Sequence, residues 1–152
     1  METTDQRSLA TQALFAEKAK SYIVCYTTSC PLREHCLRSI LTNYLPKDQF
    51  ITTCINLSHP LMQQQGCPRY ASDKPIVMPY GLSKMYYDMP GRVERAIKKH
   101  LITKYSRKRY YEYHNGTRPL TPDVEAYIRK TLLAFGWKQE PVFLGYTEEY
   151  LW

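Results

Sequence analysis

A chain of 152 residues with a formal net charge of +7 has the size of one basic globular domain. Its hydrophobic fraction of 43% excludes an intrinsically disordered chain. No run approaches the roughly 18 apolar residues of a membrane span, and the first residues are acidic and polar, unlike a secretory signal. We therefore expect a cytoplasmic protein that does not bind membranes.

The fold class expected is α+β and mostly helical, with helices around a small two-stranded β element next to a cysteine cluster. The elements predicted in the first half are a helix over 4–19, a short helix over 37–41, and extended segments over 50–57 and 76–78. Thr3 and Gln6 have capping-box spacing at the start of the first helix. The two extended segments are predicted to pair with each other as a ribbon.

The second half is predicted to hold three helices and an apolar tail. The helices begin near Asp88 or Pro90, at Arg107 after Ser106 as N-cap, and at Pro122. The second is expected to end at Asn115-Gly116 and the third at Gly136, because glycine favours helix C-termini. The tail over 141–152 is rich in large apolar residues and is expected to dock on the core.

This organisation predicts a single domain over residues 1–152. A cysteine-cluster part covers 1–80, and a basic helical part with the docked C-terminal tail covers 81–152. The sequence contains neither an internal repeat nor a low-complexity linker.

Four cysteines form the first candidate site. They are Cys25, Cys30, Cys36 and Cys67, in the pattern Cys-x4-Cys-x5-Cys followed by a more distant fourth. Thiolates are the ligands preferred by zinc and iron–sulfur centres. We expect zinc, because a structural four-thiolate site needs no assembly machinery. An iron–sulfur cluster is the alternative, since Cys30-Pro31 and Cys67-Pro68 resemble Cys-Pro pairs beside such clusters.

Other interpretations of the cysteines remain open. Reduced thiols are also common as small buried residues in a reducing compartment, and disulfides or reactive thiols are further alternatives. Cys54 lies in a predicted strand and is expected to be the non-ligand cysteine. His35 and His59 are possible substitute ligands, or partners of a thiol nucleophile.

The positive charge is concentrated in residues 92–109, which hold eight basic residues against Glu94 alone. A positive field from one segment favours polyanions such as nucleic acid, although a solvated helix face would have the same composition.

Residues 106–118 resemble the recognition helix and following turn of Cro/repressor-type helix-turn-helix domains. The matching positions are Ser106, Arg107, Asn115, Gly116 and Arg118, while His100 and Lys104 stand where that pattern has a small residue and a glycine. The resemblance implies major-groove contacts from Arg107, Lys108, Arg109 and Tyr111, and phosphate contacts from Lys104 and Arg118. A packing helix with basic residues that keep it soluble is the alternative.

Taken whole, the chain resembles a family of small uncharacterised proteins from Bacteroides and its relatives, known only as a domain of unknown function. The features that carry this resemblance are Cys25-x4-Cys30-Pro31-x4-Cys36-Leu37-Arg38, Gly66-Cys67-Pro68, Tyr80-Gly81, Tyr110-Tyr111, Gly116-x-Arg118-Pro119-Leu120-x-Pro122 and the aromatic tail. No activity follows from it.

The function expected is a nucleic-acid-binding regulatory module, with DNA as the target, that contains a structural four-cysteine metal site. The first alternative is a protein-interaction or adaptor module that meets an acidic protein partner and does not bind nucleic acid. An iron–sulfur redox sensor is a more distant one. We expect no enzyme and no catalytic residues, because the sequence has no phosphate-binding loop, nucleophile elbow, zincin motif or dinucleotide fingerprint.

Overall fold

The computed structural model describes residues 7–152, apart from the side chain of Gln63. The described chain forms two compact units, which we call unit 1 (residues up to Lys74, together with Trp152) and unit 2 (Pro75–Leu151). Helices dominate, and one two-stranded antiparallel sheet accompanies them, so the predicted α+β, mostly helical class is confirmed. The prediction that residues 1–152 behave as a single domain stays a prediction.

Unit 1 begins with helix α1, Leu9–Ala19. The Ser8 hydroxyl caps it by accepting a hydrogen bond from the Thr11 amide at 3.2 Å. The predicted start at residue 4 was therefore wrong, because Arg7 and Ser8 are not helical and Ser8 provides the cap. The capping box predicted for Thr3 and Gln6 lies outside the described residues.

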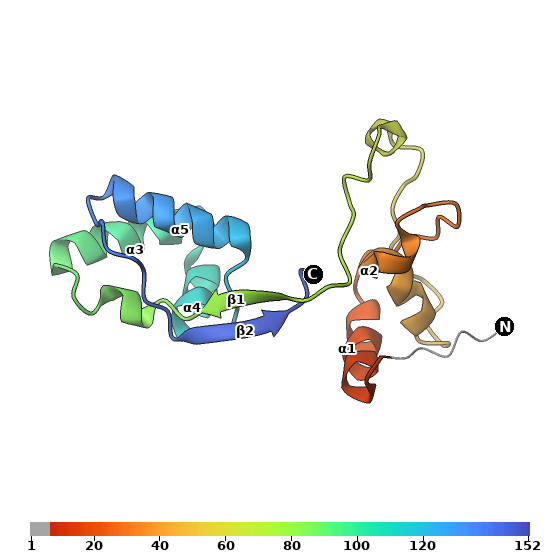
Figure 1. Ribbon diagram of the computed structural model, residues 1–152, viewed down its shortest axis with the longest axis horizontal. Coiled ribbons are helices and arrows are strands. Elements are labelled where there is room, and N and C mark those ends of the chain that lie inside the picture. Colours follow the sequence, from red (N-terminus) through yellow and green to blue (C-terminus); the bar gives the residue numbers. More distant parts are fainter. Residues whose placement is uncertain (1–6) are drawn as a thin grey trace. The chain divides into compact units, whose positions relative to one another are not determined.

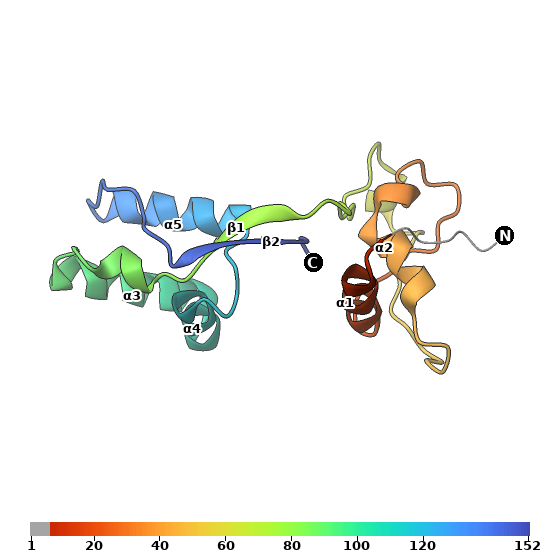
Figure 2. The ribbon, with the colours of Figure 1, turned by 60° about the horizontal axis from the view of Figure 1, so that its bottom comes forward.

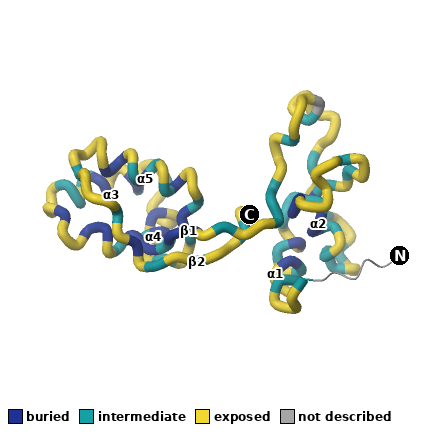
Figure 3. Tube along the Cα trace, in the orientation of Figure 1, coloured by how far each residue is buried: buried dark blue, intermediate teal, exposed yellow. Residues whose placement is uncertain are grey.

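The rest of unit 1 consists of short helical turns joined by extended chain. Helix α2, Leu37–Ile40, confirms the predicted short helix, and single 3₁₀ turns span Arg33–His35, Leu41–Tyr44 and Pro60–Gln63. The buried residues of this unit are Phe15, Ala19, Val24, Cys36, Leu37, Ile40 and Leu41. Trp152 packs edge-on against Phe15, with ring centroids 6.0 Å apart. Most of the loop residues of unit 1 are exposed (Figure 3).

The sheet of unit 2 pairs β1, Ile76–Tyr80, with β2, Gly145–Glu149, and places Met78 opposite Thr147. The predicted pairing of 76–78 with 50–57 was wrong. Residues 50–57 make only an isolated parallel bridge within unit 1, between Cys54 and Val24. Strand β2 was missed because its side chains are mostly exposed and polar, so it lacks the alternation of a half-buried strand. The sheet consequently belongs to unit 2, whereas every cysteine belongs to unit 1.

Three helices complete unit 2 and confirm the predicted order: α3 Gly91–Tyr105, α4 Arg107–Asn115 and α5 Pro122–Ala134. A 3₁₀ turn over Ser83–Tyr86 precedes them. Figures 1 and 2 both show α5 running beside α3. Helix α4 begins after Ser106, as predicted, and ends at Gly116, whose φ of 80° is readily adopted only by glycine.

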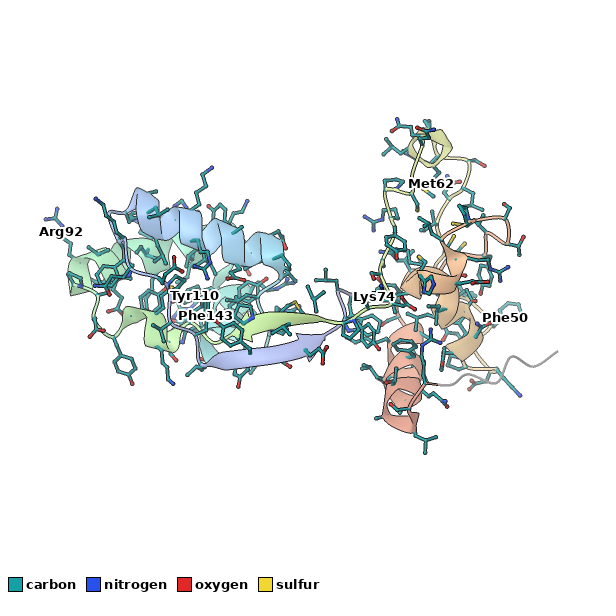
Figure 4. All side chains as sticks on the ribbon, viewed as in Figure 1. Phe50, Met62, Lys74, Arg92, Tyr110 and Phe143 are labelled. Atoms are coloured by element: carbon teal, nitrogen blue, oxygen red, sulfur yellow. The ribbon has the colours of Figure 1, made fainter. Side chains whose placement is uncertain are left out.

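The helices, the 3₁₀ turn and the tail share one core. Its buried members are Leu82, Met85, Tyr86, Met89, Ile97, Leu101, Tyr110, Tyr113, Leu120, Val124, Ile128, Leu132 and Phe143. Figure 4 shows Tyr110 and Phe143 pointing into the interior of unit 2, whereas Arg92 points away from it. Because Phe143 belongs to the tail, the expectation that the tail docks on the core is confirmed at this residue.

Candidate metal centre and candidate nucleic-acid interface

The four predicted metal ligands come from four separate segments of unit 1. Cys25 follows Val24, and the Cys25 amide donates a hydrogen bond to the Arg38 carbonyl at 2.8 Å. Cys36 directly precedes α2 and forms a β-bridge with Ser72. Cys30 and Cys67 each occupy the first position of a tight turn. The backbone hydrogen bonds therefore fix the chain at each of these cysteines.

The turns at Cys30 and Cys67 are built alike. The Cys30 carbonyl accepts from the Arg33 amide at 3.2 Å, and the Cys67 carbonyl accepts from the Tyr70 amide at the same distance. In both turns proline follows the cysteine, and its fixed φ favours that second position of a β-turn. The two Cys-Pro pairs that stood out in the sequence therefore have a structural role in holding two cysteines on rigid turns.

All four cysteines line one small cavity of about 20 Å³. Cys54 does not line it and is exposed. An adjoining, more open hollow of about 440 Å³ is lined by Cys25, Cys30 and Cys67. Among residues 7–152, no three histidine, cysteine, aspartate or glutamate side chains are arranged to hold a metal ion. The four thiols share the walls of a cavity but do not yet converge on one point.

The two histidines considered as substitute ligands lie elsewhere. Neither His35 nor His59 lines the cavity of the four cysteines. The Nδ1 atom of His35 is 3.5 Å from an Asp73 carboxylate oxygen. The Nδ1 atom of His59 accepts a hydrogen bond from the Leu61 amide at 3.2 Å. Neither histidine is therefore placed among the walls of the four-cysteine cavity, whereas His59 lines a separate hollow together with Cys54.

Arginine side chains that the sequence reasoning missed surround the cysteines. Arg33, Arg38 and Arg69 line the four-cysteine cavity, and no acidic residue lines it among the described residues. The Arg38 guanidinium donates to the Ile23 carbonyl at 2.8 Å and to the Arg69 carbonyl at 2.7 Å. It thereby joins the segment that leads into Cys25 to the segment that follows Cys67.

The second candidate site is the outer face of α4. Tyr110 and Tyr113, one helical turn apart, are buried in the core of unit 2. All six residues predicted to contact nucleic acid are exposed: Lys104, Arg107, Lys108, Arg109, Tyr111 and Arg118. Helix α4 is therefore held by its tyrosines and presents its basic residues to solvent.

Two of the basic residues share a carboxylate. An oxygen of Glu112 lies 2.7 Å from Arg118 and 3.5 Å from Arg109. The hydrogen bond from Arg118 is the largest of the effects that lower the pKa of Glu112. By contrast, the Arg107 guanidinium lies over the ring of Tyr111, 5.9 Å from its centroid. Glu112 thus offsets part of the charge near Arg109 and Arg118.

Below α4, two tyrosine hydroxyls meet in the core. The Tyr110 hydroxyl donates to the Tyr86 hydroxyl at 3.2 Å. Burial is the main cause that raises the pKa of Tyr110 to about 12, and it raises the pKa of Tyr86 as well. Both phenols are therefore neutral at physiological pH and serve as packing groups that satisfy each other.

Comparison with known protein families matches residues 5–152 to the model of DUF6078, a family of unknown function. The chain belongs to the DUF6078 family. No curated protein and no solved structure matches it. In the described part of this DUF6078 protein, no helix combines the length and the apolar character needed to cross a bilayer.

Within this DUF6078 protein, the cysteine spacing identified the four candidate metal ligands but did not predict the residues around them. Cys25, Cys30, Cys36 and Cys67 line one cavity, and their role as metal ligands stays a prediction. The roles of Arg38 and Arg69 were missed because both depend on segments distant in sequence. Arg38 donates hydrogen bonds to two backbone carbonyls, and Arg69 lines the cavity. The one available signal was the position of Arg38 two residues after Cys36, on the short helix that this cysteine precedes.

Proposed function

We propose that this protein is a nucleic-acid-binding module whose recognition element is α4, with duplex DNA as the target. One observation carries the proposal: α4 is anchored by buried Tyr110 and Tyr113 while Arg107, Lys108 and Arg109 all face solvent. A rigid helix with an outward basic face is the form in which many DNA-binding domains enter the major groove.

The surroundings of α4 support a polyanionic ligand. Arg92, Arg95 and Lys99 are exposed on α3, at a spacing that places them on one face of that helix. They add exposed positive charge to unit 2 outside α4 and, in this proposal, provide further phosphate contacts, which dominate nucleic-acid affinity. Lys104 and Arg118, at the two ends of the α4 region, are further phosphate ligands in this proposal.

The sequence of the region also supports the proposal. Residues 106–118 resemble the recognition helix and turn of Cro/repressor-type domains, and α3, α4 and α5 follow one another with short connections. The positive φ expected of a turn glycine occurs at Ser106, with φ of 73°, two residues beyond the place where the pattern has glycine. The resemblance therefore applies to α4 and its flanking turns more closely than to the crossing of α3 with α4.

Equilibrium binding to a fluorescent random-sequence duplex tests the proposal. Native protein should bind at low salt, and the affinity should fall linearly on a log–log plot against salt concentration. The double variant Arg107→Ala/Arg109→Ala should lose about a hundredfold in affinity, from roughly 1.4 kcal/mol for each contact. We expect its circular dichroism to be unchanged, because both side chains are exposed.

The matched control is Lys130→Ala/Lys138→Ala, which removes the same charge from exposed positions outside residues 92–109. It should retain affinity within a few-fold. Equal losses in the two double variants would mean that only net charge attracts the DNA, and α4 would not be the recognition element. Absence of binding even at low salt would refute the function itself.

A second candidate function rests on Glu112, whose carboxylate lies near both Arg109 and Arg118. A carboxylate of an acidic protein partner can be accepted by the same surface. This adaptor function requires that the protein show no affinity for DNA or RNA at physiological salt.

We also propose a cytoplasmic location for the nucleic-acid-binding protein, because five unpaired thiols suit a reducing compartment.

A further inference from the structure

We propose that Cys25, Cys30, Cys36 and Cys67 bind one Zn²⁺ ion as a structural four-thiolate site, with Arg38 as the residue that positions two of the cysteine segments. This site lies in unit 1 and is independent of the nucleic-acid function proposed for α4 in unit 2.

The folding of unit 1 places the four thiols on the walls of one cavity, although they do not converge on one point. They come from four segments spread over residues 25–67, and all of them line a single cavity, whereas Cys54 does not. Buried cysteines that merely fill space would resemble Val24 or Leu37, which are fully buried. Cys25, Cys30 and Cys67 are only partly buried, although they meet in one cavity. Cysteines that line a shared cavity without full burial fit a ligand set near a surface better than they fit core packing.

The size of the cavity favours a single ion. A volume of about 20 Å³ holds roughly one water-sized particle. An iron–sulfur cluster needs more room than this, and the larger hollow nearby is not lined by Cys36. A single Zn²⁺ requires the thiolates to close from the cavity walls to about 2.3 Å from the ion. The open hollow beside the cavity provides an entry path for the metal.

The charges around the cavity complement a four-thiolate zinc site. Four thiolates and one Zn²⁺ carry a net charge of −2, which is unfavourable in a partly buried site unless cations lie nearby. Arg33, Arg38 and Arg69 line the cavity, and none of the described residues that line it is acidic. A binding site for a lone cation would show the opposite balance, with carboxylates on its walls.

Arg38 organises the site without touching the metal. Its guanidinium hydrogen-bonds to the carbonyls of Ile23 and Arg69, each two residues from a ligand cysteine. The ring of Tyr22 lies 4.8 Å from the same guanidinium and holds it in place. Interactions of this kind fix the orientation of metal ligands, and their loss typically lowers metal affinity by about 10–100-fold.

The first experiment is elemental analysis of the full-length protein, purified without oxygen and without added metal. Native protein and Cys54→Ser should each contain one zinc per chain, whereas Cys30→Ser and Cys67→Ser should contain much less. Cys54→Ser is the matched control because it removes an exposed thiol that does not line the cavity. Iron, absence of metal in the native protein, or loss of zinc in Cys54→Ser would each overturn the proposal.

A cysteine variant that fails to fold would also lose its zinc, so a second readout uses native protein. Replacement of zinc by Co²⁺ should give the absorption spectrum of a tetrahedral ion with four thiolate ligands. A spectrum of octahedral cobalt, or one with fewer than four thiolates, would exclude the assigned ligand set. Both readouts are independent of DNA binding, so failure of this proposal is distinguishable from failure of the proposed function.

Competition with a chromophoric chelator tests the role of Arg38. Arg38→Lys keeps the positive charge but cannot bridge both carbonyls, so it should release zinc at about 10–100-fold lower chelator concentration. Arg33→Lys is the matched control, because it makes the same charge-conserving exchange at a cavity arginine whose guanidinium donates to the Thr28 carbonyl and joins no two cysteine segments. Full zinc affinity in Arg38→Lys would show that Arg38 contributes charge alone.

Discussion

The hydroxyl pair beneath α4 offers a quantitative test of how unit 2 is held together. Tyr110 donates to Tyr86 at 3.2 Å, and both residues are buried. Replacing either tyrosine by phenylalanine keeps the ring in the core but leaves the other hydroxyl buried without its partner. Replacing both removes the whole polar pair. The loss of stability in the double variant should therefore be smaller than the sum of the losses in the two single variants.

The expected magnitudes follow from the penalty for an unsatisfied buried polar group. Each single variant should lose about 1–3 kcal/mol, whereas the double variant should lose about 1 kcal/mol or less. With a urea m-value of about 2 kcal/mol/M, a loss of 2 kcal/mol lowers the midpoint by about 1 M. Tyr111→Phe is the control, because its hydroxyl belongs to an exposed side chain of the same helix and its loss should change stability by less than about 0.5 kcal/mol.

The measurement is urea unfolding at neutral pH, followed by circular dichroism. Burial raises the pKa of Tyr110 from 10.0 to about 12, so the stability that depends on its neutral form is fully present below pH 10 and is lost as the pH rises towards 12. Neutral pH therefore keeps both phenols protonated throughout. Strictly additive effects in the double variant would refute the reasoning, because they would show that the hydroxyls do not depend on each other.

Two further predictions concern the backbone and the two units. Ser106 has φ 73° and ψ 157°, a conformation that disfavours every residue except glycine by about 1–3 kcal/mol. Ser106→Gly should therefore raise the free energy of unfolding by about 1 kcal/mol. Ser106→Ala keeps the backbone strain and loses the N-cap, so it should lower the free energy of unfolding by about 1 kcal/mol. Thermal unfolding measures both variants, and changes of the same sign in the two would contradict this account. The chain has two tryptophans, Trp137 in unit 2 and Trp152 in unit 1. The variant Trp152→Phe therefore keeps a fluorescent reporter in unit 2 alone, and the variant Trp137→Phe keeps one in unit 1 alone. A single domain requires both reporters to show the same urea midpoint, and separated midpoints would show that the units unfold independently.

The helices of unit 2 could be predicted because their ends are encoded locally. Ser106, Pro122, Gly116 and Gly136 are residues with strong preferences for helix termini, and the buried positions between them repeat with helical spacing. Such signals depend on neighbours within a few residues.

The sheet and the arginines around the cysteines depend on partners far along the chain. Strand β1 pairs with a segment almost seventy residues later. The side chains of Val77 and Tyr146 are exposed, so the two strands lack the hydrophobic alternation from which their pairing could be predicted. Arg38 likewise serves two backbone carbonyls, and any residue can supply a carbonyl. Cysteine spacing was informative because few roles require four thiols, whereas arginine has many roles on a protein surface.

The two candidate sites can be examined separately because their supporting cores do not overlap. All five cysteines lie in unit 1, and the core beneath α4 is built from residues 82–143. A chelator that removes metal from the four cysteines should therefore destabilise the surroundings of Trp152, since a structural zinc ion contributes its binding energy to folding. If the units unfold independently, DNA affinity should survive that treatment. If the chain is one cooperative domain, metal loss should reduce DNA binding and shift the unfolding of both tryptophan reporters together.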